Sequence, residues 1–304
     1  MKVEKKKWDG WQLDRPLTVQ IAGNVIDITQ TARPPSDLSR LIEWLDADSY
    51  VDLRSGEIKE AKRTDNRSQS LAEVRRTLKR MRGLINANWF GDNNELLVTL
   101  TYAENMTDHK RLSHDLDIFL KRAKRMLGEI KYIAAVEPQG RGAWHAHILV
   151  KQMTSHYTYW PAEEVAKIWE HGQIIDVRRL RAVNNVGAYL SAYLTNTPAE
   201  DEPAPAAWRG QPRNINQPKR VVKGGRLHLY PRGMHIYRAS KNLDKPEVKK
   251  MRPSSEELRT LLQGATVTFK SKIILTGTDQ DSQSDFYINT IAQMQLNRKS
   301  DSSE

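Results

Sequence analysis

The chain contains no cysteine, which excludes disulfide bonds and metal sites built on thiolates. It has no run of about 18 consecutive apolar residues, and its N-terminus lacks the apolar segment of a signal peptide. The P-loop pattern Gly-x-x-x-x-Gly-Lys-Ser/Thr does not occur, which excludes a fused ATPase of that type. We therefore expect a cytoplasmic protein with no membrane partner.

Acidic residues are also in short supply. The 304 residues include 48 lysines and arginines against 37 aspartates and glutamates, which gives a net charge of +11. A balance of this kind favours a polyanionic partner, most often nucleic acid and less often a membrane surface. The length suffices for two modest domains, or for one domain with extensions.

Three regions are predicted along the chain. Residues 1–65 form an N-terminal accessory region with short strands at 17–21 and 24–28 and a helix at 38–45. Residues 66–246 form the main domain. Residues 247–304 form a basic C-terminal region whose tail, from residue 296, is polar and expected to be disordered.

The main domain alternates helices with strands. Ser70-Leu-Ala-Glu73 is a capping box that opens a helix, and a second helix is expected from Ser113. Further predicted elements are strands at 96–102, 131–136, 144–150 and 174–178, and helices from 160 and over 184–196. This order predicts an α+β fold with a central, mostly antiparallel sheet flanked by helices.

Two histidines stand out in a run that alternates like a strand. His145 and His147 are separated by one alanine, so their side chains emerge on the same face of the strand. A glycine-containing turn at 138–142 would fold this strand back beside the preceding one and bring Glu137 close to His145. Two imidazoles and one carboxylate fit a divalent metal site, although ordinary packing is the more common role of such a pair.

Two tyrosines share a face of the last predicted helix. Tyr189 and Tyr193 lie about 40° apart on a helical wheel, at the border of its apolar stripe. Such tyrosines often only anchor a helix to a core. A phenol is also a poor nucleophile unless its target is polarised, and a metal ion at a phosphate would do this.

Basic side chains gather beside these elements. They are candidates for contacts with DNA phosphates, and equally for a solvated surface. They lie on the first helix, in the turn before the histidines and after the fourth strand, and the candidates are Arg75, Arg76, Lys79, Arg141, Arg178 and Arg179.

Three motifs together resemble those of a known family. They are Val98-Thr-Leu-Thr-Tyr102, Glu137-Pro-Gln-x-Arg-Gly-Ala-Trp-His145-x-His147 and Tyr189-x-x-x-Tyr193. They resemble the motifs of rolling-circle replication initiators, the Rep proteins of the His-hydrophobic-His (HUH) endonuclease superfamily found in plasmids, integrative elements and phages of the gene A type. The run from Gly225 to Lys241 resembles the end of the same catalytic region, and the likeness covers roughly residues 50–246.

The resemblance implies a palm-like HUH fold and a specific chemistry. His145, His147 and Glu137 would bind Mg²⁺ or Mn²⁺ beside the scissile phosphate of single-stranded or hairpin origin DNA. Tyr189 or Tyr193 would attack that phosphate, giving a 5′-phosphotyrosine and a free 3′-OH. A host polymerase would extend the 3′-OH, a host helicase would unwind the duplex, and the second tyrosine could close the displaced circle.

One departure from the family pattern leaves alternatives open. Many relatives carry a lysine beside or three residues after the second tyrosine, where this chain has Ala192 and Asn196. Either another cation serves, with Arg178, Arg179 and Arg181 near in sequence, or the tyrosines are not equivalent, with Tyr189 slightly favoured as the first. A relaxase, a single-strand transposase and an inactive DNA-binding regulator of the same fold are the competing predictions, and a metal hydrolase of small substrates has no use for the positive charge.

Overall fold

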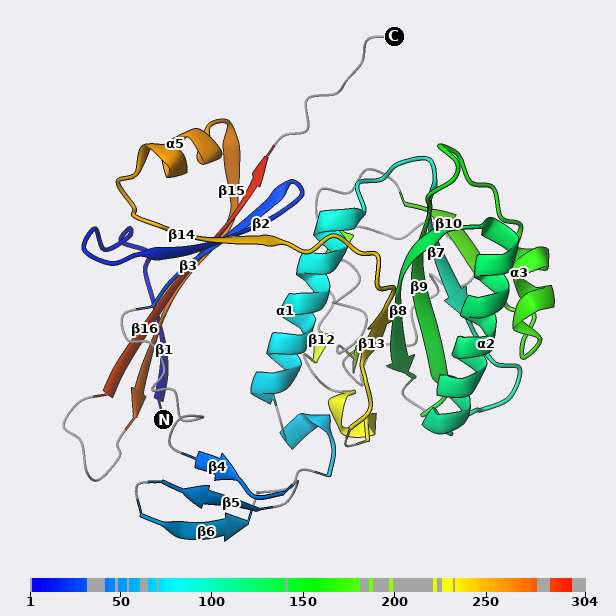
Figure 1. Ribbon diagram of the computed structural model, residues 1–304, viewed down its shortest axis with the longest axis horizontal. Helices are drawn as coiled ribbons and strands as arrows, with labels where there is room; N and C mark the ends of the chain where they lie inside the picture. The colour runs from blue at the N-terminus through cyan, green and yellow to red at the C-terminus, as the bar shows by residue number, and fades with distance from the viewer. Residues whose placement is uncertain are drawn as a thin grey trace. The chain divides into compact units, whose positions relative to one another are not determined.

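The computed structural model describes residues 2–31, 42–46, 49–53, 55–60, 65–69, 71–139, 142–180, 186–187, 197–198, 221–222, 226–231, 233–277 and 285–296. The chain forms two compact units (Figure 1). Thr64–Asp244 is the central unit, and Met1–Arg63 with Lys245–Glu304 is the terminal unit. In the described ranges, every helix is too short or too polar to cross a bilayer.

The terminal unit joins the two ends of the chain in one antiparallel sheet with the strand order β1-β15-β16-β3-β2-β14. Its elements are β1 (Lys2–Lys6), β2 (Leu17–Ala22), β3 (Val25–Thr31), β14 (Glu247–Met251), α5 (Glu256–Leu262), β15 (Ala265–Gly277) and β16 (Asp285–Leu296). The predicted strands at 17–21 and 24–28 are confirmed as β2 and β3. Alternate residues of β2 and β3 pack with Met251 and Leu258 in a small core.

The helix predicted at 38–45 is wrong where the structure describes it, because Ile42–Trp44 is a strand, β4. It pairs with β5 (Ser49–Asp52), which pairs with β6 (Glu57–Glu60). Trp44 lies opposite Tyr50, and their ring centroids are 5.5 Å apart. A short apolar run fits a helix and a strand equally well, and this cross-strand aromatic pair favours the strand.

The central unit is built on a five-stranded antiparallel sheet with the order β10-β7-β9-β8-β13. The strands are β7 (Glu95–Leu100), β8 (Ile130–Pro138), β9 (Trp144–Gln152), β10 (Asp176–Arg179) and β13 (Tyr237–Ala239). Two very short strands, β11 (Thr197–Pro198) and β12 (Val221–Val222), pair with each other, and two 3-10 turns are η2 (Arg67–Gln69) and η4 (Leu227–Leu229). The predicted hairpin of β8 and β9 is confirmed.

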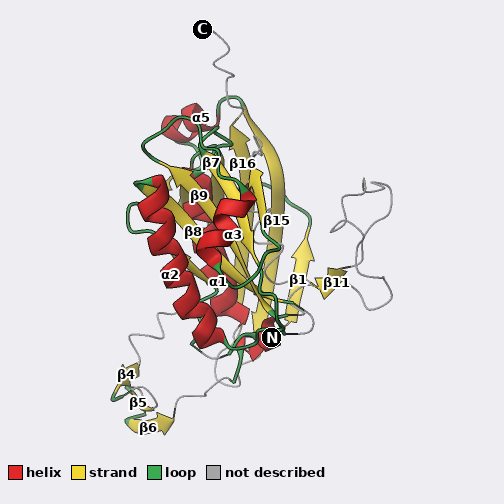
Figure 2. Cartoon of the chain, turned by 90° about the vertical axis from the view of Figure 1, so that its right-hand side faces the viewer, coloured by secondary structure: helices red, strands yellow, loops and turns green. Residues whose placement is uncertain are grey.

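Helices cover both faces of this sheet. α1 (Leu71–Asn88) lies on one side, while α2 (His109–Leu127) and α3 (Ala162–Trp169) lie on the other (Figure 1). Figure 2, seen from the side of α2 and α3, shows these two helices in front of the strands. Apolar residues at helical spacing in α1 and α2 are buried against the strands in one core. The predicted α+β sheet flanked by helices is thus confirmed.

α2 begins one turn earlier than the sequence suggested. Its N-cap is Asp108, whose side chain accepts hydrogen bonds from the backbone N–H groups of Lys110 and Arg111. Ser113, the predicted start, lies inside the helix. Aspartate and serine cap helices equally well, so a single sequence does not distinguish two such candidates four or five residues apart.

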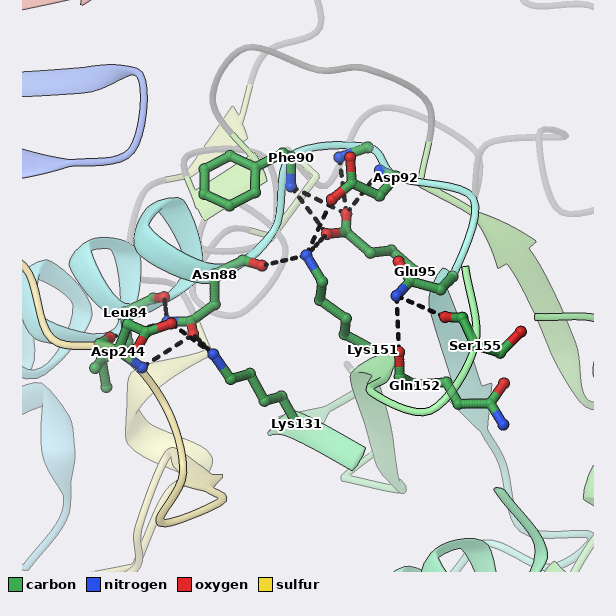
Figure 3. A network of polar contacts seen from close by, with 12 residues as sticks. Leu84, Asn88, Phe90, Asp92, Glu95, Lys131, Lys151, Gln152, Ser155 and Asp244 are labelled. Atoms are coloured by element: carbon green, nitrogen blue, oxygen red, sulfur yellow. Dashed lines mark hydrogen bonds and ion pairs between the residues drawn. The ribbon is translucent and has the colours of Figure 1, made fainter. Parts of the chain in front are cut away.

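Polar contacts fix the end of α1 to the sheet (Figure 3). Lys131 of β8 donates to Asn88 Oδ1 over 3.0 Å, and Lys151 of β9 donates to the Asn88 carbonyl over 3.3 Å. Lys151 also binds Glu95 of β7, with Nζ and Oε1 2.8 Å apart. These side chains share the face of the sheet that α1 covers, the same face from which the two histidines emerge.

Candidate metal centre

The register of the β8–β9 hairpin brings the three predicted ligands to one face. Glu137 pairs directly with His145, and Ala135 pairs with His147 two residues further along. Side chains of directly opposed residues in an antiparallel pair lie on the same side of the sheet. All three ligands are buried, with exposed fractions of 7% for Glu137, 7% for His145 and 6% for His147.

Both nitrogens of His147 have partners. Nε2 is 2.7 Å from Glu137 Oε2, and Nδ1 is 3.2 Å from Thr99 Oγ1. A carboxylate only accepts, so Nε2 carries the proton and Nδ1 accepts from the threonine hydroxyl. Burial lowers the pKa of His147 to about 4, with Asp176 acting in the opposite direction. The ring is therefore neutral at pH 7, the form in which a histidine binds a metal ion.

His145 faces the turn of the hairpin. Its Nδ1 is 3.5 Å from Nε2 of Gln139. Gln139 accepts from Gly142 N–H through its carbonyl and donates its own N–H to the carbonyl of Ala143, which closes the described ends of the turn. Gly142 has φ of +86°, a conformation that glycine adopts without strain.

An arginine that the sequence did not single out lies on Glu137. Arg226, just before η4, forms an ion pair with Glu137 Oε1, while His147 holds the other oxygen. Burial lowers the pKa of Arg226, yet an arginine stays charged in proteins. Among the described residues, no three histidine, aspartate or glutamate side chains converge on one point. A metal ion held by Glu137 would therefore have to take the place of the guanidinium.

A row of side chains crosses the whole sheet through His147. The paired residues are Asp176 of β10, Thr99 of β7, His147 of β9, Ala135 of β8 and Tyr237 of β13. All of them share the histidine face. Asp176 contributes a negative charge at one end of this row, and its carboxylate binds Arg178, with Nε and Oδ2 2.7 Å apart.

The segment that leads to the two tyrosines reaches the helix over this face. Tyr189 and Tyr193 lie outside the described residues. Val186 is 3% exposed and belongs to the core, and Gly187 donates its N–H to Asn86 Oδ1 of α1 over 3.0 Å. A Cβ on Gly187 would lie 2.9 Å from both the Cα and the carbonyl oxygen of Arg82, so only glycine permits this approach.

The predicted DNA-contacting cations fall in separate places. Arg75, Arg76 and Lys79 are exposed on α1, and Arg141 lies outside the described residues. On β10, Arg178 shares the histidine face, because it pairs with Leu97, two residues from Thr99. Arg179 points to the other face, where its guanidinium carbon stacks 4.0 Å from the ring centroid of Tyr157.

Three neighbours of the ligands escaped sequence reasoning. Thr99 stands in a strand whose alternation could have placed it on the same face as a histidine, had the pairing been known. Asp176 required the register of a strand distant in sequence. Arg226 carried no local signal beyond its place in the run that resembles the end of the family's catalytic region.

Comparison with known proteins bears on this same part of the chain. A family model described as replication-associated protein, of the ORF2 type, matches residues 95–198. The match covers about a third of the chain and includes β7, the β8–β9 hairpin with the three candidate ligands, and the tyrosine segment. Neither curated proteins nor solved structures give a match. The family match supports a role in DNA replication.

Proposed function

We propose that this protein initiates rolling-circle DNA replication as a metal-dependent enzyme of HUH type that nicks and rejoins one DNA strand. One observation carries the proposal. Glu137, His145 and His147 emerge from one sheet face, and the segment leading to Tyr189 and Tyr193 docks through Gly187 on the helix that covers that face. The family match over the same residues agrees with it.

The side chains present suit Mg²⁺ or Mn²⁺. Two imidazoles and a carboxylate form a donor set that such ions accept, and the low pKa of His147 keeps its ring free to bind one. The ion would polarise the scissile phosphate and stabilise the charge that develops on it. Thr99 fixes the orientation of His147, since it holds Nδ1 and leaves Nε2 directed toward Glu137.

The reaction we propose is a transesterification at a phosphodiester of origin DNA. The phenol oxygen of one tyrosine forms a bond to phosphorus as the bond to the 3′ oxygen breaks. The phenol proton leaves to solvent or a nearby base, and the released oxygen takes up a proton to become the 3′-OH. The 5′-phosphotyrosine keeps the energy of the broken ester, so the second tyrosine or a 3′-OH can reverse the step. We propose that a host polymerase extends the 3′-OH and that a host helicase unwinds the duplex.

Arg226 and the cations near the ligands take supporting parts in this proposal. When a divalent ion replaces it at Glu137, Arg226 is freed to bind a phosphate oxygen of the DNA. Arg178 lies on the same sheet face and offers a second cation. These two arginines are our candidates for the role that a lysine near the second tyrosine plays in many related enzymes.

The decisive experiment is incubation with labelled single-stranded origin DNA and Mn²⁺, followed by a denaturing gel. We expect a protease-sensitive adduct that is lost in Tyr189→Phe or Tyr193→Phe and in His147→Ala, and that EDTA prevents. Thr154→Ala, a change on the surface away from the ligands, is the control and should leave the adduct unchanged. Specific binding without an adduct at any metal concentration would instead identify a DNA-binding regulator.

A further inference from the structure

Two cavities lie along α2 on the face of the sheet opposite the histidines. The first has a volume of 340 Å³ and lies between the first half of α2 and residues 233–238. The second has a volume of 650 Å³ and lies between the second half of α2 and residues 240–242. Both also border β8, through Val136 in the first cavity and through Ile130 and Tyr132 in the second. We call the two together the α2 groove.

One arginine fixes the walls of the groove at its middle. Arg238 of β13 donates to Asp117 Oδ1 over 2.5 Å and to the Ser113 carbonyl over 3.1 Å, and it also binds the Ser113 hydroxyl. Arg238 lines the first cavity and Asp117 the second, so the cavities lie end to end along the helix. At a rise of 1.5 Å per residue, the stretch of α2 from His109 to Lys124 is about 22 Å long.

The charge in the groove is positive. Its lining includes Lys110, Lys121, Lys124 and Lys241, and none of these four lysines forms an ion pair with another described residue. Elsewhere on α2, Arg111 pairs with Glu104, and Arg122 pairs with Glu170. Several of the helix's unpaired cations therefore face the groove, where phosphates can neutralise them.

The floor of the groove is apolar and aromatic. Leu112, Leu116 and Val136 line the first cavity, and Leu120, Ile130 and Tyr132 line the second. Bases of a single strand can stack on such surfaces while their phosphates meet the lysines at the rim. A duplex keeps its bases inside and presents only phosphates, so it makes no use of the floor.

We propose that the α2 groove binds single-stranded DNA that flanks the nick site. This inference rests on the function proposed above and adds a second contact region to it. The groove begins at Val136, the residue before Glu137, so a strand held there reaches the end of β8 where the candidate ligands lie on the other face. The groove thus adds to affinity for DNA beyond the cleavage site, with no part in the chemistry.

The test compares two variants of equal charge. Lys121→Gln with Lys124→Gln removes two groove cations, and Arg125→Gln with Lys167→Gln removes two exposed cations that do not line the groove. Fluorescence anisotropy with a long labelled single strand measures the dissociation constant from 50 mM to 500 mM salt. Two lost phosphate contacts lower the salt slope by about 1.4, which weakens binding about 20-fold at 0.1 M salt. The control variant should retain the wild-type slope and affinity.

Other measurements separate this inference from the proposed function. The groove variant should cleave a short oligonucleotide that spans only the nick site as fast as wild type. If neither protein cleaves it while the slopes still differ, the enzyme proposal fails and the groove stands. The groove proposal is overturned if both variants bind the long strand alike, or if a duplex of equal length loses as much affinity as the single strand does. Circular dichroism checks that both variants are folded.

Discussion

Substitution of Glu95 by glutamine should be among the most destabilising single changes of one atom type in the central unit. The carboxylate is fully buried, with an exposed fraction of 0%. It accepts from the backbone N–H groups of Phe90, Gly91 and Asp92 at distances from 2.7 to 3.2 Å, and from Lys151 Nζ at 2.8 Å (Figure 3). This single side chain thus holds the loop between α1 and β7 against the sheet.

The magnitude follows from what glutamine cannot do. One carboxylate oxygen becomes an NH₂ group, which faces donors where an acceptor is needed. Lys151, only 15% exposed at its side chain, loses its buried counter-charge and keeps Asp92, at 3.0 Å, as its acidic partner. Removing one member of a buried ion pair costs about 3–5 kcal/mol. We expect the free energy of unfolding of the central unit to fall by about that amount.

Amide hydrogen exchange of peptides from β7 and β9 measures this loss in the central unit alone, which matters in a chain with two units. Asp92→Asn is the matched control. It removes a carboxylate from the same lysine, but at a side chain that is 37% exposed, and should cost about 1 kcal/mol or less. A loss below about 1 kcal/mol for Glu95→Gln would show that the loop does not depend on this carboxylate, and the reasoning would be refuted.

Three further predictions concern the site. Arg226→Gln should tighten Mn²⁺ binding about tenfold in calorimetry, because the ion no longer competes with the guanidinium for Glu137, and weaker binding would show that the arginine supports the site. Gly187→Ala should cost about 1–3 kcal/mol by overpacking against Arg82 and should reduce nicking, whereas wild-type stability would contradict the close approach. Lowering the pH from about 7 to 4 should destabilise the central unit by up to about 3 kcal/mol, because the unfolded chain protonates His147 near its ordinary pKa while burial keeps the folded pKa at about 4; urea titrations should show this slope reduced in His147→Gln.

Local patterns in the sequence were enough to predict much of the central unit. The alternation of β9 and the turn before it predicted the hairpin and the shared face of His145, His147 and Glu137, which the register confirms. The apolar spacing of α1 and α2 predicted both helices. These features depend on residues close in sequence, and the periods of a strand and a helix are fixed by backbone geometry. The roles of Tyr189 and Tyr193 stay predictions, because these residues lie outside the described part of the chain.

Contacts between distant segments were decided by the tertiary structure alone. Arg226 reaches Glu137 across 89 positions, a separation that follows from the two residue numbers. Thr99 meets His147 only because β7 pairs with β9, and β1 pairs with β15 from the far end of the chain. No local period encodes which strands pair, since that choice depends on burying whole faces at once. The sequence by itself therefore determined which side chains share a face, and the fold determined which partners and which groove surround them.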